Sequence, residues 1–325
     1  MIKIYGENKE GKVDEKSLES IDESTDIGTN NWIAISQADS RILEIISRDT
    51  NIPLHFLMAA LDEEETARLD TEDGSVLVVL DAPVESDDDK SIYITKPFII
   101  TYNDNSFITI NQYNEFLIPD MMAKIKNIQP QKHVRTTLNL IYQMSKEFIY
   151  YLKQIDEQTK KIEHSLHSSM KNKELFELMA INKSLVYFST ALSANKAVLS
   201  KLLKSPSYKK YETDLDLMED TKVELDQAIE MCTIYRKIIE GMMTAFSSII
   251  SNNLNIVMKT LAVITIAISI PTGIASFYGM NFDNIPLAHD RWGFYVVIAV
   301  AILLALVGGA ILVYTTRNNN DKNNR

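Results

Sequence analysis

The chain has 325 residues, of which 46% are hydrophobic and 24% are charged, and its formal net charge is −11 at pH 7. This length holds one or two sizeable domains. The negative charge excludes nucleic acid as an expected partner and disfavours anionic lipid surfaces. A single cysteine, Cys232, excludes an internal disulfide framework and a cysteine-based metal site, which fits a reducing compartment.

Residues 1–118 are predicted to form an α/β domain with a largely antiparallel sheet. The β-rich runs MIKIYG, WIAIS, SVLVVLDA, SIYITKPFIITY and SFITINQ are separated by helical stretches around 41–47 and 53–61. Asn103, Asp104 and Asn105 supply a tight turn between the last two strands. The sequence shows no glycine-rich phosphate loop, no nucleophile elbow and no nucleophile with a base, so we expect neither an enzyme nor an organic cofactor.

The excess negative charge is concentrated in residues 62–90, where twelve carboxylates and two basic residues leave a balance of −10. Such a stretch is typical of a solvated face or loop, and it is also what a site that collects cations requires. The sequence leaves both interpretations open.

Residues 130–253 are predicted to form long helices, because no glycine occurs between Gly74 and Gly241. Apolar or small residues recur at alternating spacings of four and three, as in a coiled-coil seam. The seam positions are Val134, Leu138, Ile141, Ser145, Phe148, Leu152, Ile155, Thr159, Ile162 and Leu166; then Leu178, Ile181, Leu185, Phe188, Leu192, Asn195 and Leu199; then Leu225, Ile229, Cys232, Ile239, Met243, Phe246 and Ile250. The third helix shows no stop signal between 216 and 278. At 1.5 Å per residue it would be a rod of roughly 90 Å, which we expect to pack against copies of itself.

Two stretches without a charged residue predict two membrane spans: 260–282, with 23 residues, and 292–316, with 25. Each is long enough to cross a hydrocarbon core of about 30 Å. Buried helices of a soluble protein are the alternative, which two adjacent stretches of this length disfavour. The first residues, MIKIYGENKEGKVDEK, lack the features of a secretory signal, so we expect both termini in the cytoplasm, with the basic residues of the tail, 317–325, on the inner side.

The first span carries a polar stripe. Thr265, Ser269, Thr272 and Ser276 fall within an arc of about 60° on a helical wheel. A polar stripe in a membrane span must face protein or water rather than lipid. It indicates either small-residue packing between helices or the wall of a pore.

The first span ends in the residues Phe-Tyr-Gly-Met-Asn-Phe-Asp, 277–283, and the second begins about nine residues later at Trp292. Tyr-Gly-Met-Asn at this place resembles the CorA family of divalent cation transporters, and the likeness of architecture covers the whole chain. The resemblance implies a funnel-shaped homopentamer in a cell membrane, in which five first spans line a central pore for Mg²⁺. It implies these sections: 1–118, a cytoplasmic α/β domain; 130–253, a helical hairpin and stalk; 254–278, the pore helix; 279–291, an outer loop; 292–316, the second span; and 317–325, a cytoplasmic tail.

The resemblance also assigns residues to the ion pathway. A selectivity filter is expected at Gly279, Met280, Asn281 and Asp283. Pore-lining positions are expected at Asn255, Met258, Leu261, Thr265, Ser269, Thr272 and Ser276. Gly279 is further expected to need a backbone conformation that glycine alone adopts readily where the chain leaves the helix.

Regulatory Mg²⁺ between neighbouring cytoplasmic domains is a further implication of the resemblance. One acidic position of the stalk corresponds to Asp220, which Glu219 and Glu224 flank. The helix expected to supply the partner, 57–61, has no acidic residue. The remaining candidates are Asp62, Glu63, Glu64, Glu65, Asp87, Asp88 and Asp89.

The expected partners are identical subunits, the lipid bilayer and divalent metal ions, with Mg²⁺ both carried and regulatory. One alternative keeps the fold and transports Co²⁺, Ni²⁺ or Zn²⁺. In the zinc branch of the family the motif tends to carry Val rather than Met, so by resemblance Met280 argues against a zinc pathway. Soft-ligand selection would also favour His or Cys, and the first span has neither. The other alternative is a membrane-anchored acidic sensor or scaffold, which would leave the polar stripe without a role.

Overall fold

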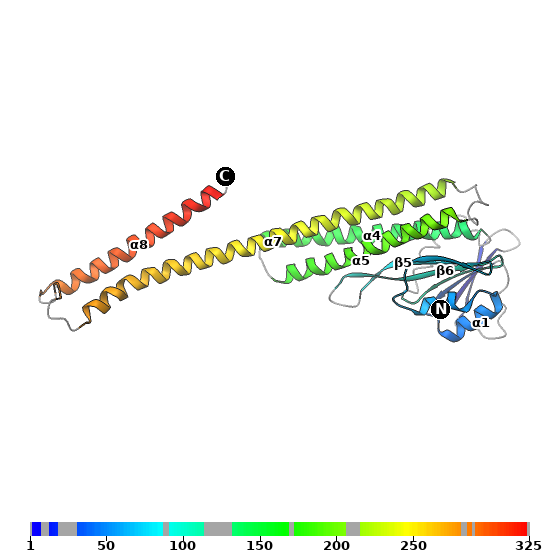
Figure 1. Cartoon of the computed structure of the whole chain (residues 1–325), viewed down its shortest axis with the longest axis horizontal. Helices are drawn as coiled ribbons and strands as arrows, with labels where there is room; N and C mark the ends of the chain where they lie inside the picture. Colours follow the sequence, from blue (N-terminus) through cyan, green and yellow to red (C-terminus); the bar gives the residue numbers. More distant parts are fainter. Residues whose placement is uncertain are drawn as a thin grey trace. The chain divides into compact units, whose positions relative to one another are not determined.

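A computed structural model of the chain describes residues 2–7, 13–18, 31–86, 91–113, 132–168, 172–205, 215–280, 285–287 and 290–323. The chain forms two compact units, Met1–Met243 and Thr244–Arg325. Figure 1 shows the strands and the helices α1, α4 and α5 in the first unit.

The first unit is built on a seven-stranded sheet with the strand order β2-β1-β3-β7-β6-β5-β4. The strands are β1 Ile2–Glu7, β2 Val13–Leu18, β3 Asn31–Ser36, β4 Arg68–Glu72, β5 Ser75–Glu85, β6 Tyr93–Tyr102 and β7 Ser106–Asn111. Among these strands β3 and β7 pair in parallel and every other neighbouring pair is antiparallel, which confirms the largely antiparallel sheet. The sequence did not predict the edge strands β2 and β4.

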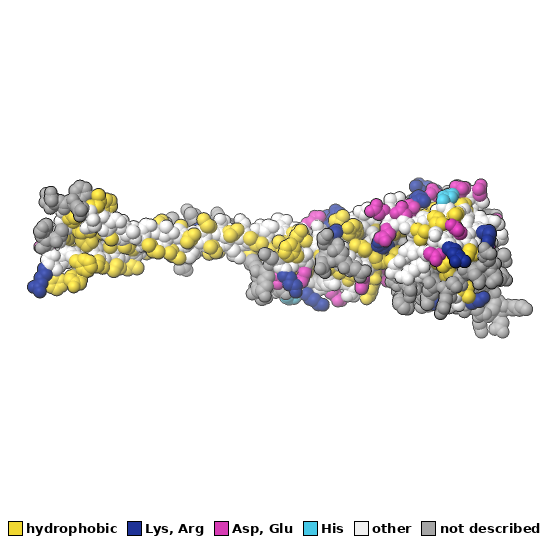
Figure 2. Space-filling model, turned by 90° about the horizontal axis from the view of Figure 1, so that it is seen from below, with side chains coloured by type: hydrophobic (Ala, Val, Ile, Leu, Met, Phe, Trp, Pro, Cys, Tyr) yellow, Lys and Arg dark blue, Asp and Glu magenta, His cyan; other side chains and the backbone are white. Residues whose placement is uncertain are grey.

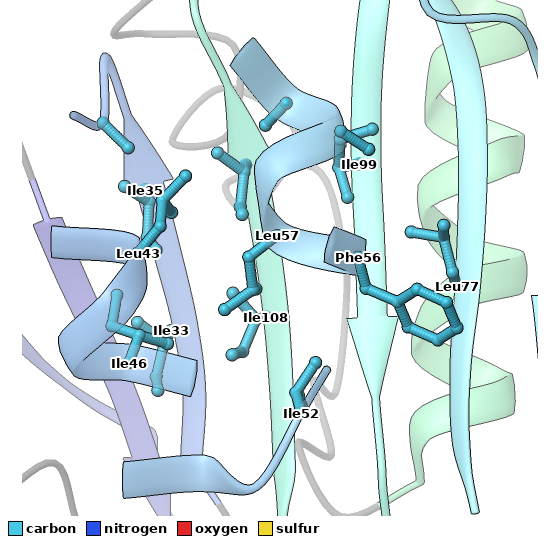
Figure 3. Packing of buried hydrophobic residues seen from close by; sticks show 14 of the residues in the cluster. Ile33, Ile35, Leu43, Ile46, Ile52, Phe56, Leu57, Leu77, Ile99 and Ile108 are labelled. Carbon is cyan, nitrogen blue, oxygen red and sulfur yellow. The ribbon is translucent and has the colours of Figure 1, made fainter. Parts of the chain in front are cut away.

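One face of the sheet is covered by helix α1 (Ser40–Thr50), helix α2 (Leu54–Met58) and the short helix η1 (Ala59–Leu61). Asp39 caps α1, since its Oδ1 accepts a hydrogen bond of 2.8 Å from the Ile42 amide. Figure 3 shows Leu43 of α1 and Leu57 of α2 pointing toward isoleucines of β3 and β7. These side chains are buried, and at about 25 cal/mol per Å² such apolar contact supplies most of the favourable free energy of folding.

The opposite face of the sheet carries a layer of aromatic side chains. Successive residues of a strand point to opposite faces, so neighbours in the sequence belong to different layers. Ile108 belongs to the isoleucine cluster, whereas its neighbour Phe107 stacks edge-on against Trp32, with ring centroids 5.5 Å apart. The Trp32 Nε1 donates to Thr109 Oγ1 at 2.8 Å, which satisfies the one polar atom of the buried indole. His133, at the start of helix α4, lies against Phe107, and burial lowers the pKa of this histidine.

Helix α5 (Asn172–Lys204) is joined to the sheet by side-chain hydrogen bonds. Strand β4 ends its pairing with β5 at Val79, which leaves the next part of the β5 edge without a neighbouring strand. The Asn195 Oδ1 accepts from the Asp81 amide at 2.9 Å and its Nδ2 donates to the Asp81 carbonyl at 2.8 Å, so this side chain replaces a strand. Ser184 Oγ accepts from the amide of Tyr93 at 2.9 Å.

The long helices follow the predicted seams. They are α4 (His133–Ser168), α5 and α7 (Leu215–Tyr278), and α7 is continuous through Pro271 as expected. Seam residues of α4 and α5 whose side chains the structure describes are buried. On α7 the seam residues Leu225, Cys232, Ile239 and Phe246 are buried, Ile229 and Met243 are half-buried, and Ile250 is 36% exposed. Cys232 is buried and its Sγ donates to the Leu185 carbonyl at 3.4 Å, and burial raises the pKa of this thiol to about 11.

The second unit holds the end of α7 and helix α8 (Gly293–Asn323). Both helices are long and apolar enough to cross a membrane, which agrees with the two predicted spans. On the face seen in Figure 2, hydrophobic side chains run along the helices of the second unit, with basic side chains at one end, while acidic side chains gather on the first unit.

Candidate ion pathway and regulatory carboxylates

Three hydroxyl groups of the polar stripe, those of Thr265, Ser269 and Thr272, have a defined hydrogen-bonding direction. Thr265 Oγ1 donates to the Leu261 carbonyl at 2.8 Å, and Ser269 Oγ donates to the Thr265 carbonyl at 2.7 Å. Thr272 Oγ1 donates in the same way to Ile268, at 2.8 Å. Because each hydroxyl proton is used by the backbone one turn earlier, the oxygen lone pairs are what these side chains offer to their surroundings.

The polar stripe lies on the side of α7 away from α8. A Cβ added at Gly308 of α8 would lie 3.2 Å from the Cδ1 of Ile270, so the two helices approach each other there. At 100° per residue Ile270 lies about 130° from the centre of the stripe. Other partly buried positions on the same side of the span are Val263, Ala267 and Ile274. Packing against α8 therefore does not explain the stripe, whose members Thr265, Ser269, Thr272 and Ser276 are exposed in the single chain.

The other predicted pore positions share this exposure. Met258 is 62% exposed and Leu261 is 55% exposed, and Asn255 is also exposed. An apolar side chain with this much exposure in a membrane span requires lipid or another protein surface beside it.

The predicted filter lies only partly within the described residues. Gly279 follows α7 directly, with its amide donating to the Ala275 carbonyl at 3.0 Å, and the exposed Met280 comes next. The conformational reason expected for Gly279 is wrong: its φ is not positive, and an added Cβ would meet the nearest atom, the Ala275 carbonyl oxygen, at an ordinary 3.4 Å. Asn281 and Asp283 lie outside the described residues.

The acidic stretch is partly neutralised within the chain. Glu63 pairs with Lys96 of β6, and that hydrogen bond and charge lower the pKa of the Glu63 carboxyl. Arg68 of β4 pairs with Glu65 and with Asp70. The stretch contains all of β4 and β5, so it is not one solvated loop.

The remaining carboxylates of the stretch make fewer contacts. Asp62 Oδ1 accepts a local hydrogen bond of 2.9 Å from the Glu64 amide, and both side chains are exposed. Asp87, Asp88 and Asp89 lie outside the described residues. The described residues contain no group of three or more acidic, histidine or cysteine side chains placed to hold a metal within one chain.

The stalk carboxylates face a lysine that sequence reasoning did not single out. Lys146 of α4 has a raised pKa, first because of its hydrogen bond to Tyr142 and further because of the negative charges of Glu224 and Asp220. Its Nζ lies 4.5 Å from the centroid of the Tyr142 ring. Glu219 is exposed on the same helix as these two acids. A lysine within a predicted coiled coil gives no sign of which acids of a distant helix influence its pKa, so this electrostatic interaction required the tertiary structure.

Comparison with known proteins supplies the family. Residues 28–314 match the family described as CorA-like Mg²⁺ transporter protein. A curated relative, the cobalt/magnesium transport protein CorA of Methanocaldococcus jannaschii, is 24% identical over 312 residues, which cover 94% of this chain and 96% of that protein.

Solved structures show the same fold. The complete structure of the CorA magnesium transporter from Methanocaldococcus jannaschii superposes with a TM-score of 0.76 at 23% identity, covering 98% of this chain and 97% of the other. The full-length CmaX protein gives a TM-score of 0.65 at 15% identity, covering 98% and 96%. Since the family match spans most of the sequence, and two apolar helices accompany it, the chain belongs to the CorA-like Mg²⁺ transporter family of membrane proteins and is a divalent cation transporter.

Proposed function

We propose that five copies of this chain form a Mg²⁺ channel in which α7 lines a central pore. The observation that carries this proposal is the polar stripe on the side of α7 away from α8. Its hydroxyl groups present oxygen lone pairs, while their protons are bonded to the helix itself. The water shell of a cation presents hydrogens outward, so a ring of such oxygens accepts hydrogen bonds from a hydrated ion.

Mg²⁺ suits this kind of pathway because it gives up its water reluctantly and prefers octahedral oxygen ligands. At the outer end, five Asn281 amide oxygens would accept hydrogen bonds from the shell of the ion, with Gly279, Met280 and Asp283 completing the loop. Toward the cytoplasm, Met258 and Leu261 would form an apolar constriction that closes by losing its water, with Asn255 at the inner mouth. An inside-negative potential supplies about 4.6 kcal/mol per 100 mV for a doubly charged ion.

The proposed topology places residues 1–118 and 130–253 in the cytoplasm, with 254–278 and 292–316 as spans and 317–325 back inside. Regulatory Mg²⁺ would bind between neighbouring subunits, with Asp220 as the principal ligand on the stalk. Lys146 would compete with the ion for the same carboxylate, because the negative charge of Asp220 is one of the causes that raise the pKa of this lysine.

Co²⁺ is the second candidate cargo, since the relative that covers 94% of this chain is named for cobalt as well as magnesium. Ni²⁺ and Zn²⁺ are less well matched, because the stripe offers oxygen atoms and no imidazole or thiolate.

The proposal is tested by Mg²⁺ flux into liposomes that contain only this protein, with an imposed inside-negative potential. We expect uptake that Co²⁺ competes for more strongly than Zn²⁺. Asn281→Ala should lower the flux by at least about tenfold, which corresponds to a loss of roughly 1.4 kcal/mol in the interaction of the ion with the filter. Asn284→Ala, which changes the same residue type outside the motif, is the matched control. Unchanged flux and selectivity in Asn281→Ala would rule out this filter.

A further inference from the structure

A cavity of about 630 Å³ lies between the loop-proximal ends of the two predicted spans. This volume is in the range of sites that bind small molecules. Its walls come from residues 271–279 at the end of α7, from Leu287 of the loop and from 293–302 of α8, and it is apolar apart from Tyr278 and Asp290. At 1.5 Å per residue these walls are about 12–14 Å deep, close to half of a hydrocarbon core of about 30 Å.

The packing of the two helices explains why the space is present. Further along the helices, Gly308 lets α8 approach Ile270 closely. At the loop, Gly293 lies against the Leu287 carbonyl so tightly that an added Cβ would overlap it. Between these two contacts the facing residues include Ala275 and Ala301, which are too small to fill the gap.

Aromatic side chains place the mouth of the cavity at the boundary between hydrocarbon and water. Trp292 is 72% exposed and Tyr295 is 64% exposed, with ring centroids 6.0 Å apart. Exposed Trp and Tyr at the end of a span are typical of the headgroup level. Asp290 lines the cavity at this level, Arg291 follows it, and neither forms an ion pair with another described residue.

We infer that this cavity binds one acyl chain of a phosphatidylethanolamine molecule, with Asp290 holding the headgroup amine and Arg291 the phosphate. The cavity is as deep as one leaflet and apolar, as an acyl chain requires. Asp290, which lines the cavity, is negatively charged, and Arg291, the exposed residue that follows it in the chain, is positively charged, so the two together complement a headgroup with both charges. An apolar helix of a second subunit would instead leave the Asp290 carboxylate without compensation. The inference rests on the proposed topology only for the leaflet that supplies the lipid.

The chain supplies its own reporter for a test. It has two tryptophans, and Trp32 is fully buried in the first unit. Trp32→Phe leaves Trp292 beside the cavity as the single fluorophore. The full chain carrying this change would be reconstituted in phosphatidylcholine vesicles that contain equal fractions of phosphatidylethanolamine, phosphatidylcholine or phosphatidylglycerol with brominated acyl chains, which quench tryptophan on contact.

We expect brominated phosphatidylethanolamine to quench Trp292 with an apparent affinity about threefold above phosphatidylcholine, the size of effect of one exposed ion pair. Ala301→Leu, which fills the cavity, and Asp290→Asn should each bring the ratio to about one. Ala299→Leu, on an exposed part of α8 outside the cavity, and Asp290→Glu should keep it.

Three outcomes would overturn the inference: equal quenching by all three headgroups in the parent protein, a preference for phosphatidylglycerol, or a preference that survives both Ala301→Leu and Asp290→Asn. The readout is contact with lipid rather than ion flux. A protein that bound this lipid but carried no Mg²⁺ would therefore contradict the proposed function and leave this inference standing.

Discussion

Among single residues, Asp81 is a largely buried carboxylate on the sheet. It lies on β5, and burial raises its pKa from 3.8 to about 6. Its backbone is fully used by Asn195, but no described residue forms an ion pair with its carboxylate. The charge of Asp81 also helps to raise the pKa of the Tyr113 hydroxyl, after burial as the main cause.

We predict that Asp81→Asn stabilises the first unit at pH 8 by about 2 kcal/mol. The folded chain binds the Asp81 proton more tightly than the unfolded chain does. The contribution to stability is therefore fully present below about pH 4, falls as the pH rises toward 6, and is absent above that. Thermal unfolding of the full chain in detergent with a chelator would be followed from pH 4 to 8. The difference between variant and parent should vanish near pH 4. Glu44→Gln on the exposed side of α1 is the control, and a lower Tm for Asp81→Asn at pH 8 would contradict the prediction.

Among the elements, α5 depends on a polar side chain within its apolar seam, Asn195. Asn195 was expected only to continue the seam, and the structure shows that it also closes an open stretch of the β5 edge. Asn195 can do both because its side chain is buried and faces the sheet.

We predict that Asn195→Ala lowers the free energy of unfolding by about 2–3 kcal/mol, because the Asp81 amide and carbonyl lose their partners in a buried place. Asn195→Asp should be worse, since a carboxylate oxygen would then face the Asp81 carbonyl. Denaturant unfolding measures both effects. Ser193→Ala removes an exposed hydroxyl from the same helix and should be nearly neutral. If all three variants were as stable as the parent protein, the β5 edge would not need the Asn195 side-chain amide.

The face of α7 away from α8 provides an accessibility test of the pore. In a chain whose Cys232 has been replaced, cysteines at Thr265, Ser269 and Thr272 should react with small hydrophilic thiol reagents in the open channel. A cysteine at Ile270 should not react, because this side chain lies against α8. Labelling is measured by mass increase in liposomes under potential. Equal reaction on both faces would show that α7 does not line a pore.

In the whole molecule, the proposed gating would let Mg²⁺ bound at the cytoplasmic part of the chain control the pore part of α7. Within one chain Glu63 and Glu65 are already paired with Lys96 and Arg68, so under the proposed gating they are poorer candidates for a shared Mg²⁺ site. The proposal therefore assigns the principal regulatory role to Asp220, whose charge is one of those that raise the pKa of Lys146.

We predict that Asp220→Asn raises the internal Mg²⁺ concentration for half-inhibition by about tenfold, the loss of roughly 1.4 kcal/mol of binding. Protease protection by Mg²⁺ should weaken in parallel. Currents are recorded while internal Mg²⁺ is raised from micromolar to tens of millimolar. Asp226→Asn, at an acid of the same helix that pairs with Lys196 of α5, is the control. Both variants should keep a protein mass of five times 36.9 kDa. Identical inhibition in Asp220→Asn and parent would remove Asp220 from gating.

The sequence by itself determined the features that depend on local periodicity and on long runs of one composition. The seams of α4 and α5, the unbroken α7 and the two spans were predictable, because burial on one helix face repeats every three to four residues and a span needs about twenty apolar ones. Edge strands were not predictable, since β4 (RLDTE) is mostly polar and is held by pairing with β5.

Only the tertiary structure decided which charges are compensated and which face of a helix remains open. Lys96 and Glu63 are 33 residues apart, and their pairing depends on how the sheet brings β6 beside the end of η1. The polar stripe can be read from the sequence, but its separation from α8 depends on where Gly308 meets Ile270. These features arise from contacts between residues distant in sequence. Spacing along the chain determines which side chains share one face of a helix, and tertiary packing determines which other residues that face contacts.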